Sequence, residues 1–306
     1  MNEFDNMIKI GELADKKITE EIVSEMLKRN IHLEKVYDSQ NQMFVLYARD
    51  EESATVAFDY YRVKVGFAPP PKPLPKEWES IKNAPLGKLT IVFLAISLFV
   101  YGSRLFMGDS LFELFFMSNN QNGELTEIKN GEYWRLFTPV FLHFNLLHIL
   151  FNGMWMKDLG SLIEHHKGML FYLVLILVSG LLSNLGQFYV KGPFFGGLSG
   201  IVYALLGFIW MNKRFFPKVS YSLPRNDVLL MIGWFFFCFT GLLGPIANTA
   251  HGIGLAIGMI FGVFSGSISA KTFNPVLMLG FCLLALAFGA GTFAFEFFIL
   301  PMISAS

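Results

Sequence analysis

The sequence predicts a polytopic α-helical membrane protein that carries a small α+β domain at its N-terminus. The 306-residue chain is 53% hydrophobic and has a mean hydropathy of +0.48. Only 16% of its residues are charged, whereas about a quarter is usual in a soluble domain. The apolar residues are concentrated after Leu86, in stretches long enough to cross a bilayer. The first part of the chain carries many of the charges and is typical of soluble sequence.

Charge and cysteine content exclude several classes of function. The net charge is zero, which gives no general attraction to nucleic acid. The two cysteines, Cys238 and Cys282, lie inside apolar runs, which favours buried thiols over a disulfide framework or a cysteine-rich metal site. The first residues contain no apolar segment of the kind found in signal peptides. We therefore expect the N-terminal domain to stay in the cytoplasm.

The N-terminal domain is predicted to span residues 1–66. Thr19 is the expected N-cap of its first helix, Asn30 is the expected stop, and a second helix is expected to start after Asp50. Alternating apolar residues indicate three strands. The predicted order is β-α-β-β-α, with the strands and the first helix at 7–10, 19–27, 31–37 and 43–47. No residues in the domain suggest catalysis, so a binding or regulatory role stays open.

Residues 67–86 are predicted to form a linker. Five of the seven residues from Pro69 to Pro75 are prolines, which favours an extended polyproline II segment. Lysines then precede the first apolar run.

Seven apolar segments are predicted to span the membrane. Six form a core at 87–268, and a seventh lies in 269–306. Lys and Arg in the short loops place the N-terminus in the cytoplasm and the C-terminus outside. Residues 108–142, between the first two spans, contain amphipathic aromatic pieces that are expected to lie at the outer interface. The predicted spans are 87–107, 146–163, 169–189, 197–212, 227–244, 249–267 and 275–300.

Polar residues inside spans are costly and indicate functional positions. The second, fourth and sixth spans run in the same direction, and His148, Ser199 and His251 each lie near the N-terminal end of one of them. The three residues are therefore expected at similar depth towards the outer face. The full set of intramembrane candidates is His143, His148, Asn152, Glu164, Ser199, Asn248 and His251.

Ser199 lies in the segment Gly196-Gly-Leu-Ser-Gly200, which predicts a glycine-rich turn into a helix. Glycine permits unusual backbone angles and close approach of a substrate backbone. The N-terminus of the following helix offers free N–H groups and a positive dipole end, which favour an oxyanion. Small residues also serve helix packing, so this pattern alone does not decide for catalysis.

Two further pairs of residues bear on the chemistry. His148 and Asn152 share one helical face and could donate hydrogen bonds to a developing negative charge, or serve as polar contacts between helices. His251 precedes glycines at 254, 258 and 262, a flat ridge expected to pack on the short fourth helix. That packing would bring His251 to Ser199, where an imidazole could accept the hydroxyl proton. No aspartate lies in the outer part of the spans to complete a triad, so a dyad is predicted.

These motifs resemble those of the rhomboid intramembrane proteases. The resemblance rests on His143-Phe-Asn-Leu-Leu-His-Ile-Leu-Phe-Asn152, on Gly197-Leu-Ser-Gly200 with Tyr203, on Ala250-His251 with its glycine repeat, and on Trp134-Arg135 in the first loop. It covers residues 87–268 and implies a rhomboid-like bundle in the inner membrane of a bacterium, with the active site open to the periplasmic face.

The resemblance also implies a role for each site residue. Ser199 would be the nucleophile and His251 the base. His148, Asn152 and the backbone N–H of Ser199 would form the oxyanion hole. Tyr203 would stack on His251, and His143 and Glu164 would have structural roles. The supporting residues implied around the dyad are Gly197, Gly200, Tyr203, His143 and Asn248.

The resemblance implies transmembrane proteins as substrates, with no metal or organic cofactor. Zinc is disfavoured because no HExxH-like spacing is present. A mobile fifth span, with Trp234 and 235–237, is our hypothesis for the substrate gate.

Two other classes of function stay open at this point. An inactive relative that binds membrane clients would be expected to lack the serine or the histidine, but the sequence contains both. A channel or transporter would place charged pairs or broken helices near the midplane. The sequence does not predict the natural substrate, the oligomeric state or the purpose of the seventh span.

Overall fold

The computed structural model describes residues 7–68, 76–120, 124–242, 246–271 and 274–300. The chain divides into two compact units, Met1–Pro73 and Leu74–Ser306. Each unit is described by itself.

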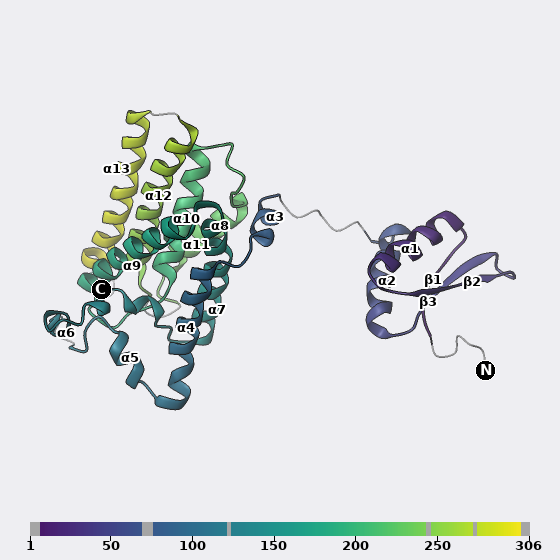
Figure 1. The fold of residues 1–306 in the computed structure, drawn as a ribbon, viewed down its shortest axis with the longest axis horizontal. Coiled ribbons are helices and arrows are strands. Elements are labelled where there is room, and N and C mark those ends of the chain that lie inside the picture. Colours follow the sequence, from purple (N-terminus) through teal and green to yellow (C-terminus); the bar gives the residue numbers. More distant parts are fainter. Residues whose placement is uncertain (1–6, 69–75, 121–123, 243–245, 272–273, 301–306) are drawn as a thin grey trace. The chain divides into compact units, whose positions relative to one another are not determined.

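The N-terminal unit is a three-stranded antiparallel sheet with two helices (Figure 1). The strand order is β1-β3-β2, with Ile8 of β1 and Leu33 of β2 both paired to Ala48 of β3. The order β-α-β-β-α agrees with the prediction. The elements are β1 Ile8–Leu13, α1 Lys16–Lys28, β2 Leu33–Asp38, β3 Met43–Ala48 and α2 Glu51–Lys64.

The helix boundaries in this unit follow from side-chain caps. The carboxylate of Asp15 accepts hydrogen bonds from the amides of Lys17 and Ile18, so Asp15 is the N-cap of α1 and the prediction of Thr19 is wrong. Thr19 instead lies in the first turn, where it is buried and its hydroxyl donates to the Asp15 carbonyl. Asp50 caps α2 as predicted, and Asn30 ends the first helix with a φ of 63°.

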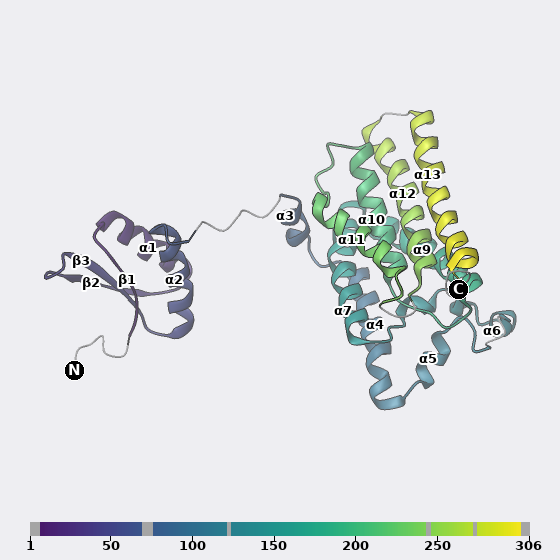
Figure 2. The same ribbon diagram turned by 180° about the vertical axis from the view of Figure 1, so that it is seen from behind.

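The larger unit is almost entirely helical (Figures 1 and 2). Its elements are α3 Lys76–Asn83, α4 Lys88–Met107, α5 Ser110–Phe115, α6 Thr126–Lys129, η1 Tyr133–Leu136, η2 Thr138–Phe141, α7 Leu146–Trp155, η3 Met156–Gly160, α8 Ser161–Lys167, α9 Met169–Lys191, α10 Ser199–Phe215, α11 Arg225–Cys238, α12 Asn248–Ala270, α13 Pro275–Ala294 and η4 Phe295–Ile299.

Each of the seven predicted spans falls on helical structure, and the second consists of α7, the π-turn η3 and α8 in succession. Among the described residues, three helices are long and apolar enough to cross a bilayer by themselves: 169–191, 248–270 and 275–299. A fourth span is possible if α3 and α4, which meet at a 77° bend, are taken together. The other helices at predicted spans are shorter or more polar than a simple spanning helix.

Two boundaries differ from the sequence prediction. The fifth span was predicted to reach residue 244, but α11 ends at Cys238 and Gly241 has a φ of +74°, and residues 243–244 lie outside the described residues. Hydropathy misplaced this end because the apolar run continues beyond the last helical residue. Residues 76–83 of the predicted linker form the helix α3, in which Ile81 is buried. The proline run 69–75 lies outside the described residues.

The helix α10 lies at the centre of the larger unit. Its residues 200–209 are all buried, and a helix that is apolar all round is expected in a core. In both ribbon views α12 lies between α10 and α13 (Figures 1 and 2). By contrast, Val276, Leu279 and Leu284 on α13 are largely exposed, as expected for side chains in contact with lipid.

The first span is anchored to the second by a buried carboxylate. Glu164 in α8 accepts hydrogen bonds from the amides of Leu89 and Thr90 and from the Thr90 hydroxyl, at 2.9–3.0 Å. These groups belong to the first turn of α4, where amides lack partners within the helix. The structural role predicted for Glu164 therefore has a physical basis, because its carboxylate caps α4.

Candidate active site

Ser199 is the first residue of α10 and follows a loop that only glycine permits. Gly197 has a φ of +127°, a backbone conformation that other residues rarely adopt. A Cβ on Gly197 would also lie only 2.7 Å from Nε2 of His148. The amide of Gly197 donates to the carbonyl of Pro139 at 3.0 Å, which fixes the loop to the segment before α7. The backbone angle of Gly197 and this hydrogen bond together fix the loop that leads into Ser199.

Glycines bring α12 into direct contact with α10. A Cβ on Gly254 would overlap the carbonyl oxygen of Gly200, and one on Gly258 would overlap that of Ala204. At Gly262 the added carbon would lie 2.6 Å from the carbonyl oxygen of Phe208. The predicted packing of the glycine ridge on the fourth helix is confirmed. The two backbones lie closer together than any larger residue would allow.

This contact places His251 beside Ser199. Nε2 of His251 lies 2.7 Å from Oγ of Ser199, which is hydrogen-bonding distance. The imidazole is buried, and its Nδ1 has no hydrogen-bond partner in the described part of the chain. Among the described residues the site therefore contains a serine–histidine pair, and no acidic side chain is hydrogen-bonded to Nδ1 of His251.

Tyr203 lies one helical turn beyond Ser199 and against the imidazole. The ring centroids of Tyr203 and His251 are 4.7 Å apart with an angle of 34° between planes. The Tyr203 hydroxyl donates to the carbonyl of Met231 in α11 at 3.0 Å. Asn248, at the start of α12, is buried and its amide nitrogen lies 3.5 Å from the carbonyl oxygen of Cys238. Both residues thus connect the site to the fifth span.

His148 and Asn152 approach the serine loop from α7. A Cβ on Gly197 would lie 3.4 Å from Nδ2 of Asn152, so both polar side chains border this glycine. Nδ2 of Asn152 is buried and has no hydrogen-bond partner among the described residues. The His143 ring packs 4.8 Å from that of His148, and its Nδ1 is 3.1 Å from the Phe141 carbonyl oxygen. A buried amide donor without a partner is available for a ligand at this place.

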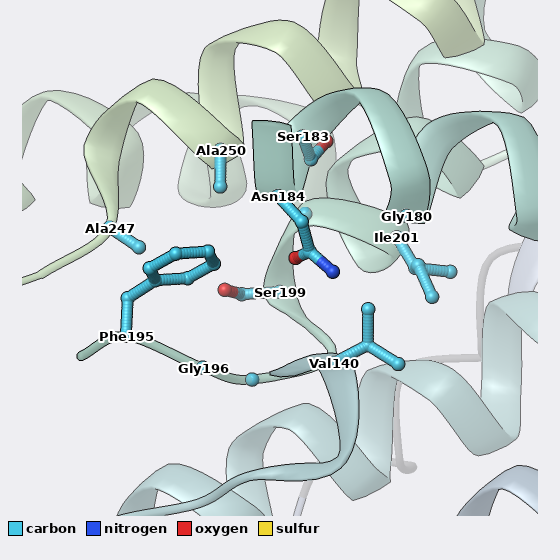
Figure 3. Close-up of a pocket in the computed structure, with 12 residues that line it drawn as sticks. Val140, Gly180, Ser183, Asn184, Phe195, Gly196, Ser199, Ile201, Ala247 and Ala250 are labelled. Atoms are coloured by element: carbon cyan, nitrogen blue, oxygen red, sulfur yellow. The ribbon is translucent and has the colours of Figure 1, made fainter. Parts of the chain in front are cut away.

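A small cavity lies directly behind Ser199. Its internal volume is about 10 Å³, and Val140, Asn184 and Phe195 are among the residues that line it (Figure 3). Such a volume holds about one water molecule. The hydroxyl of Ser183, also in its wall, is buried without a protein partner in the described residues. A water molecule in this cavity could form a hydrogen bond with the Ser183 hydroxyl close to Ser199.

The polar face of α9 was missed in the sequence analysis. Ser183 and Asn184 line the cavity, and Oε1 of Gln187 accepts a hydrogen bond from the amide of Ala250 at 3.1 Å. Polar residues at 179, 183 and 187 recur every four positions in an apolar helix and so share one face. The rule that polar residues inside a span indicate functional positions would have identified them if it had been applied to this span. Glu296, which is buried in η4, also has no role in the sequence analysis.

The described residues contain no group of three or more His, Cys, Asp or Glu side chains placed to hold a metal ion. Cys238 and Cys282 are free thiols.

The comparisons with known proteins agree with this geometry. Residues 130–268, which contain every candidate site residue, match the Rhomboid domain family. The "Rhomboid protease GlpG" of Yersinia enterocolitica is 37% identical over 187 residues, which cover 61% of this chain and 66% of that relative. Proteins of the same name from Yersinia pestis and Yersinia pseudotuberculosis are 36% identical over the same lengths. The match thus spans just under two thirds of the length of these relatives.

The candidate membrane spans and the similarity to GlpG proteins support a multi-pass helical protein of the bacterial inner membrane, with an α+β domain at its N-terminus. Over residues 130–268 the chain matches the Rhomboid domain, and it is similar to the GlpG rhomboid proteases.

Proposed function

We propose that the protein is an intramembrane serine endopeptidase, which hydrolyses peptide bonds in or near the transmembrane segments of other membrane proteins. The observation that carries the proposal is the 2.7 Å separation of Ser199 Oγ and His251 Nε2. This contact gives the serine a base at hydrogen-bonding distance, which is what a hydroxyl nucleophile requires. The names of the matched relatives support the same activity.

Acylation begins when Oγ of Ser199 attacks the carbonyl carbon of the scissile bond. Nε2 of His251 accepts the hydroxyl proton as the new C–O bond forms. Collapse of the tetrahedral intermediate breaks the C–N bond, and the imidazolium returns the proton to the leaving amine. Tyr203, whose ring lies 4.7 Å from the imidazole, holds the plane of His251 during both transfers.

The negative charge on the intermediate is stabilised by donors from two helices. The backbone N–H of Ser199 lies at the N-terminus of α10, where amides lack partners within the helix. Asn152 brings a buried Nδ2 without a partner among the described residues, and His148 borders the same glycine. Removal of one such donor typically lowers kcat by about 10²–10³.

Deacylation requires water at a partly buried serine. The cavity behind Ser199 has room for about one molecule. His251 activates this water, which attacks the acyl carbon, and Ser199 leaves as the alcohol with its proton restored.

The substrates are transmembrane proteins presented from the bilayer. By the distribution of Lys and Arg the N-terminal domain is cytoplasmic, and the site opens to the periplasmic face. We propose residues 1–66 as the cytoplasmic domain, 67–86 as the linker, 87–268 as the protease core and 269–306 as the seventh span with its tail.

The test is cleavage of a transmembrane model substrate by the protein in liposomes. Ser199→Ala and His251→Ala are compared with the unchanged protein after thermal unfolding has shown that all three are folded. The proposal expects cleavage by the unchanged protein alone. Equal inactivity of all three across several substrates would instead support a client-binding protein, and cleavage by Ser199→Ala would exclude the mechanism.

A further inference from the structure

The first turn of α12 carries the catalytic base, yet it is not capped by the side chain of its own N-cap residue. Ala247 occupies the N-cap position and has no side chain that accepts a hydrogen bond. The first amides of a helix need partners, and the need is greatest where water is excluded. Two of these amides belong to Thr249 and Ala250, the residues directly before His251.

Both amides are satisfied by side chains of neighbouring helices. Ala250 donates to Gln187 of α9. Thr249 donates its amide to Oε2 of Glu296 at 2.8 Å and its hydroxyl to the same atom at 2.6 Å. Glu296 is only 1% exposed and belongs to the π-turn η4 at the end of the seventh helix. A π-turn interrupts the regular helix and is often found at functional positions.

The seventh helix also packs on the residue that follows His251. A Cβ on Gly252 would overlap Oγ1 of Thr292 and lie 2.7 Å from its Cβ. One turn further, a Cβ on Gly289 would lie 3.2 Å from that of Ala256. The spacing of Gly289, Thr292 and Glu296 places all three on one face of this helix. In the sequence His251 therefore lies between Thr249, whose amide donates to Glu296, and Gly252, which packs against Thr292.

We propose that Glu296 is a positioning residue for the catalytic base, and that this is the purpose of the seventh helix. Its carboxylate fixes the first turn of α12, and this fixes the distance between His251 Nε2 and Ser199 Oγ. The proposal rests on the proposed function of the serine–histidine pair. Glu296 does not touch the reacting atoms. It acts through Thr249, two residues along the chain.

Two variants of similar volume separate the cap from simple packing. Glu296→Gln keeps an oxygen that accepts both hydrogen bonds from Thr249, whereas Glu296→Leu does not. The readout is the rate at which a fluorophosphonate labels Ser199 in the full-length protein, together with kcat and KM for a transmembrane substrate. Labelling reports the reactivity of the serine without substrate binding. Ser199→Ala, which should not be labelled, defines the background.

We expect Glu296→Leu to lower both the labelling rate and kcat by about tenfold to hundredfold, because small displacements of a catalytic group have effects of this size. KM should change by less than about twofold, since no substrate contact is lost. Glu296→Gln should stay within about threefold of the unchanged protein.

Met278→Ala is the control for general loosening of α13. Met278 is buried at the far end of this helix, in one cluster with Met211 and Val263. Its truncation should lower Tm and leave the labelling rate unchanged.

If Glu296→Leu is labelled at the normal rate, or no more slowly than Glu296→Gln or Met278→Ala, the proposal is wrong. If Glu296→Leu does not fold, Thr249→Val and Thr249→Ser decide the question. Only the valine variant loses the hydroxyl donor to Glu296 and should be labelled several-fold more slowly, and equal rates would overturn the proposal. If the unchanged protein is not labelled at Ser199, it is the proposed function that fails.

Discussion

Gly254 of α12 packs so tightly on Gly200 of α10 that a single added carbon would overlap the Gly200 carbonyl oxygen. Gly200 follows Ser199 directly, and Gly254 lies about one helical turn beyond His251. The 2.7 Å approach of the two catalytic candidates thus depends on a backbone contact next to each of them. The glycines of α12 set the geometry of the site as well as the packing of the helices.

Gly254→Ala should therefore damage activity and stability together. The added Cβ forces α12 away from α10, and overpacking of this kind costs about 1–3 kcal/mol. Thermal unfolding and substrate cleavage measure the two effects. Gly280→Ala in α13 is the matched control, because a Cβ there meets nothing within 4 Å. It should leave cleavage unchanged and raise Tm slightly, as alanine favours helices. A fully active Gly254→Ala protein would contradict the role given to this contact.

Gly197→Ala should abolish most cleavage while the protein stays folded. Alanine is strained at a φ of +127°, and its Cβ would press on Nε2 of His148 at 2.7 Å. Both effects displace the loop that holds Ser199. Cleavage kinetics and a melting curve distinguish this from unfolding. Gly102→Ala, where the added carbon meets nothing within 4 Å, serves as the comparison and should cleave normally.

Glu164→Ala should lower stability more than activity. The change leaves the amides of Leu89 and Thr90 without their acceptor, and hydrogen bonds to charged groups contribute about 1.5–3 kcal/mol each. The measurement is Tm in detergent, with cleavage assayed well below that temperature. Glu79→Ala, on the exposed face of α3, should leave Tm unchanged. If Glu164→Ala and Glu79→Ala melt alike, the cap on the first span contributes nothing measurable.

The gate hypothesis predicts that α11 must move away from α7. The rings of Phe151 and Trp234 lie 6.1 Å apart and join these two helices. Cysteines at these two positions, in a protein whose native thiols are replaced by serine, should allow a short bifunctional reagent that forms a disulfide with each thiol to block cleavage. Reversal by a reductant completes the test.

A second cross-link controls for this experiment. Phe215 and Phe281 join α10 to α13 with ring centroids 5.3 Å apart. Linking these positions should leave cleavage intact. If the link between α7 and α11 does not slow cleavage either, the hypothesis that α11 is the gate is wrong.

Sequence patterns predicted the parts of this fold that depend on local chemistry. The glycine repeat at 254, 258 and 262 predicted the packing of α12 on α10, because close contact needs small residues at a fixed spacing. Asp50 and Asn30 marked helix ends through their own side-chain and backbone preferences. The common direction of three spans brought His148, Ser199 and His251 to one end of the bundle.

Features that depend on tertiary partners were missed. The end of α11 at Cys238 could not be found from hydropathy, because apolar residues continue beyond it. The helix α3 was assigned to a linker because its amphipathic sequence is short and follows a proline run. The contacts of Gln187 and Glu296 with the first turn of α12 join residues far apart in the chain. No local pattern specifies such a partner.

The most direct test of the central claim is to map the site of fluorophosphonate modification by mass spectrometry of the full-length protein. The serine–histidine dyad predicts a single adduct on Ser199, its loss in His251→Ala, and loss of substrate cleavage in proportion to the modified fraction. An adduct on another residue, or full cleavage by a protein modified completely at Ser199, would contradict the assignment of Ser199 as the nucleophile.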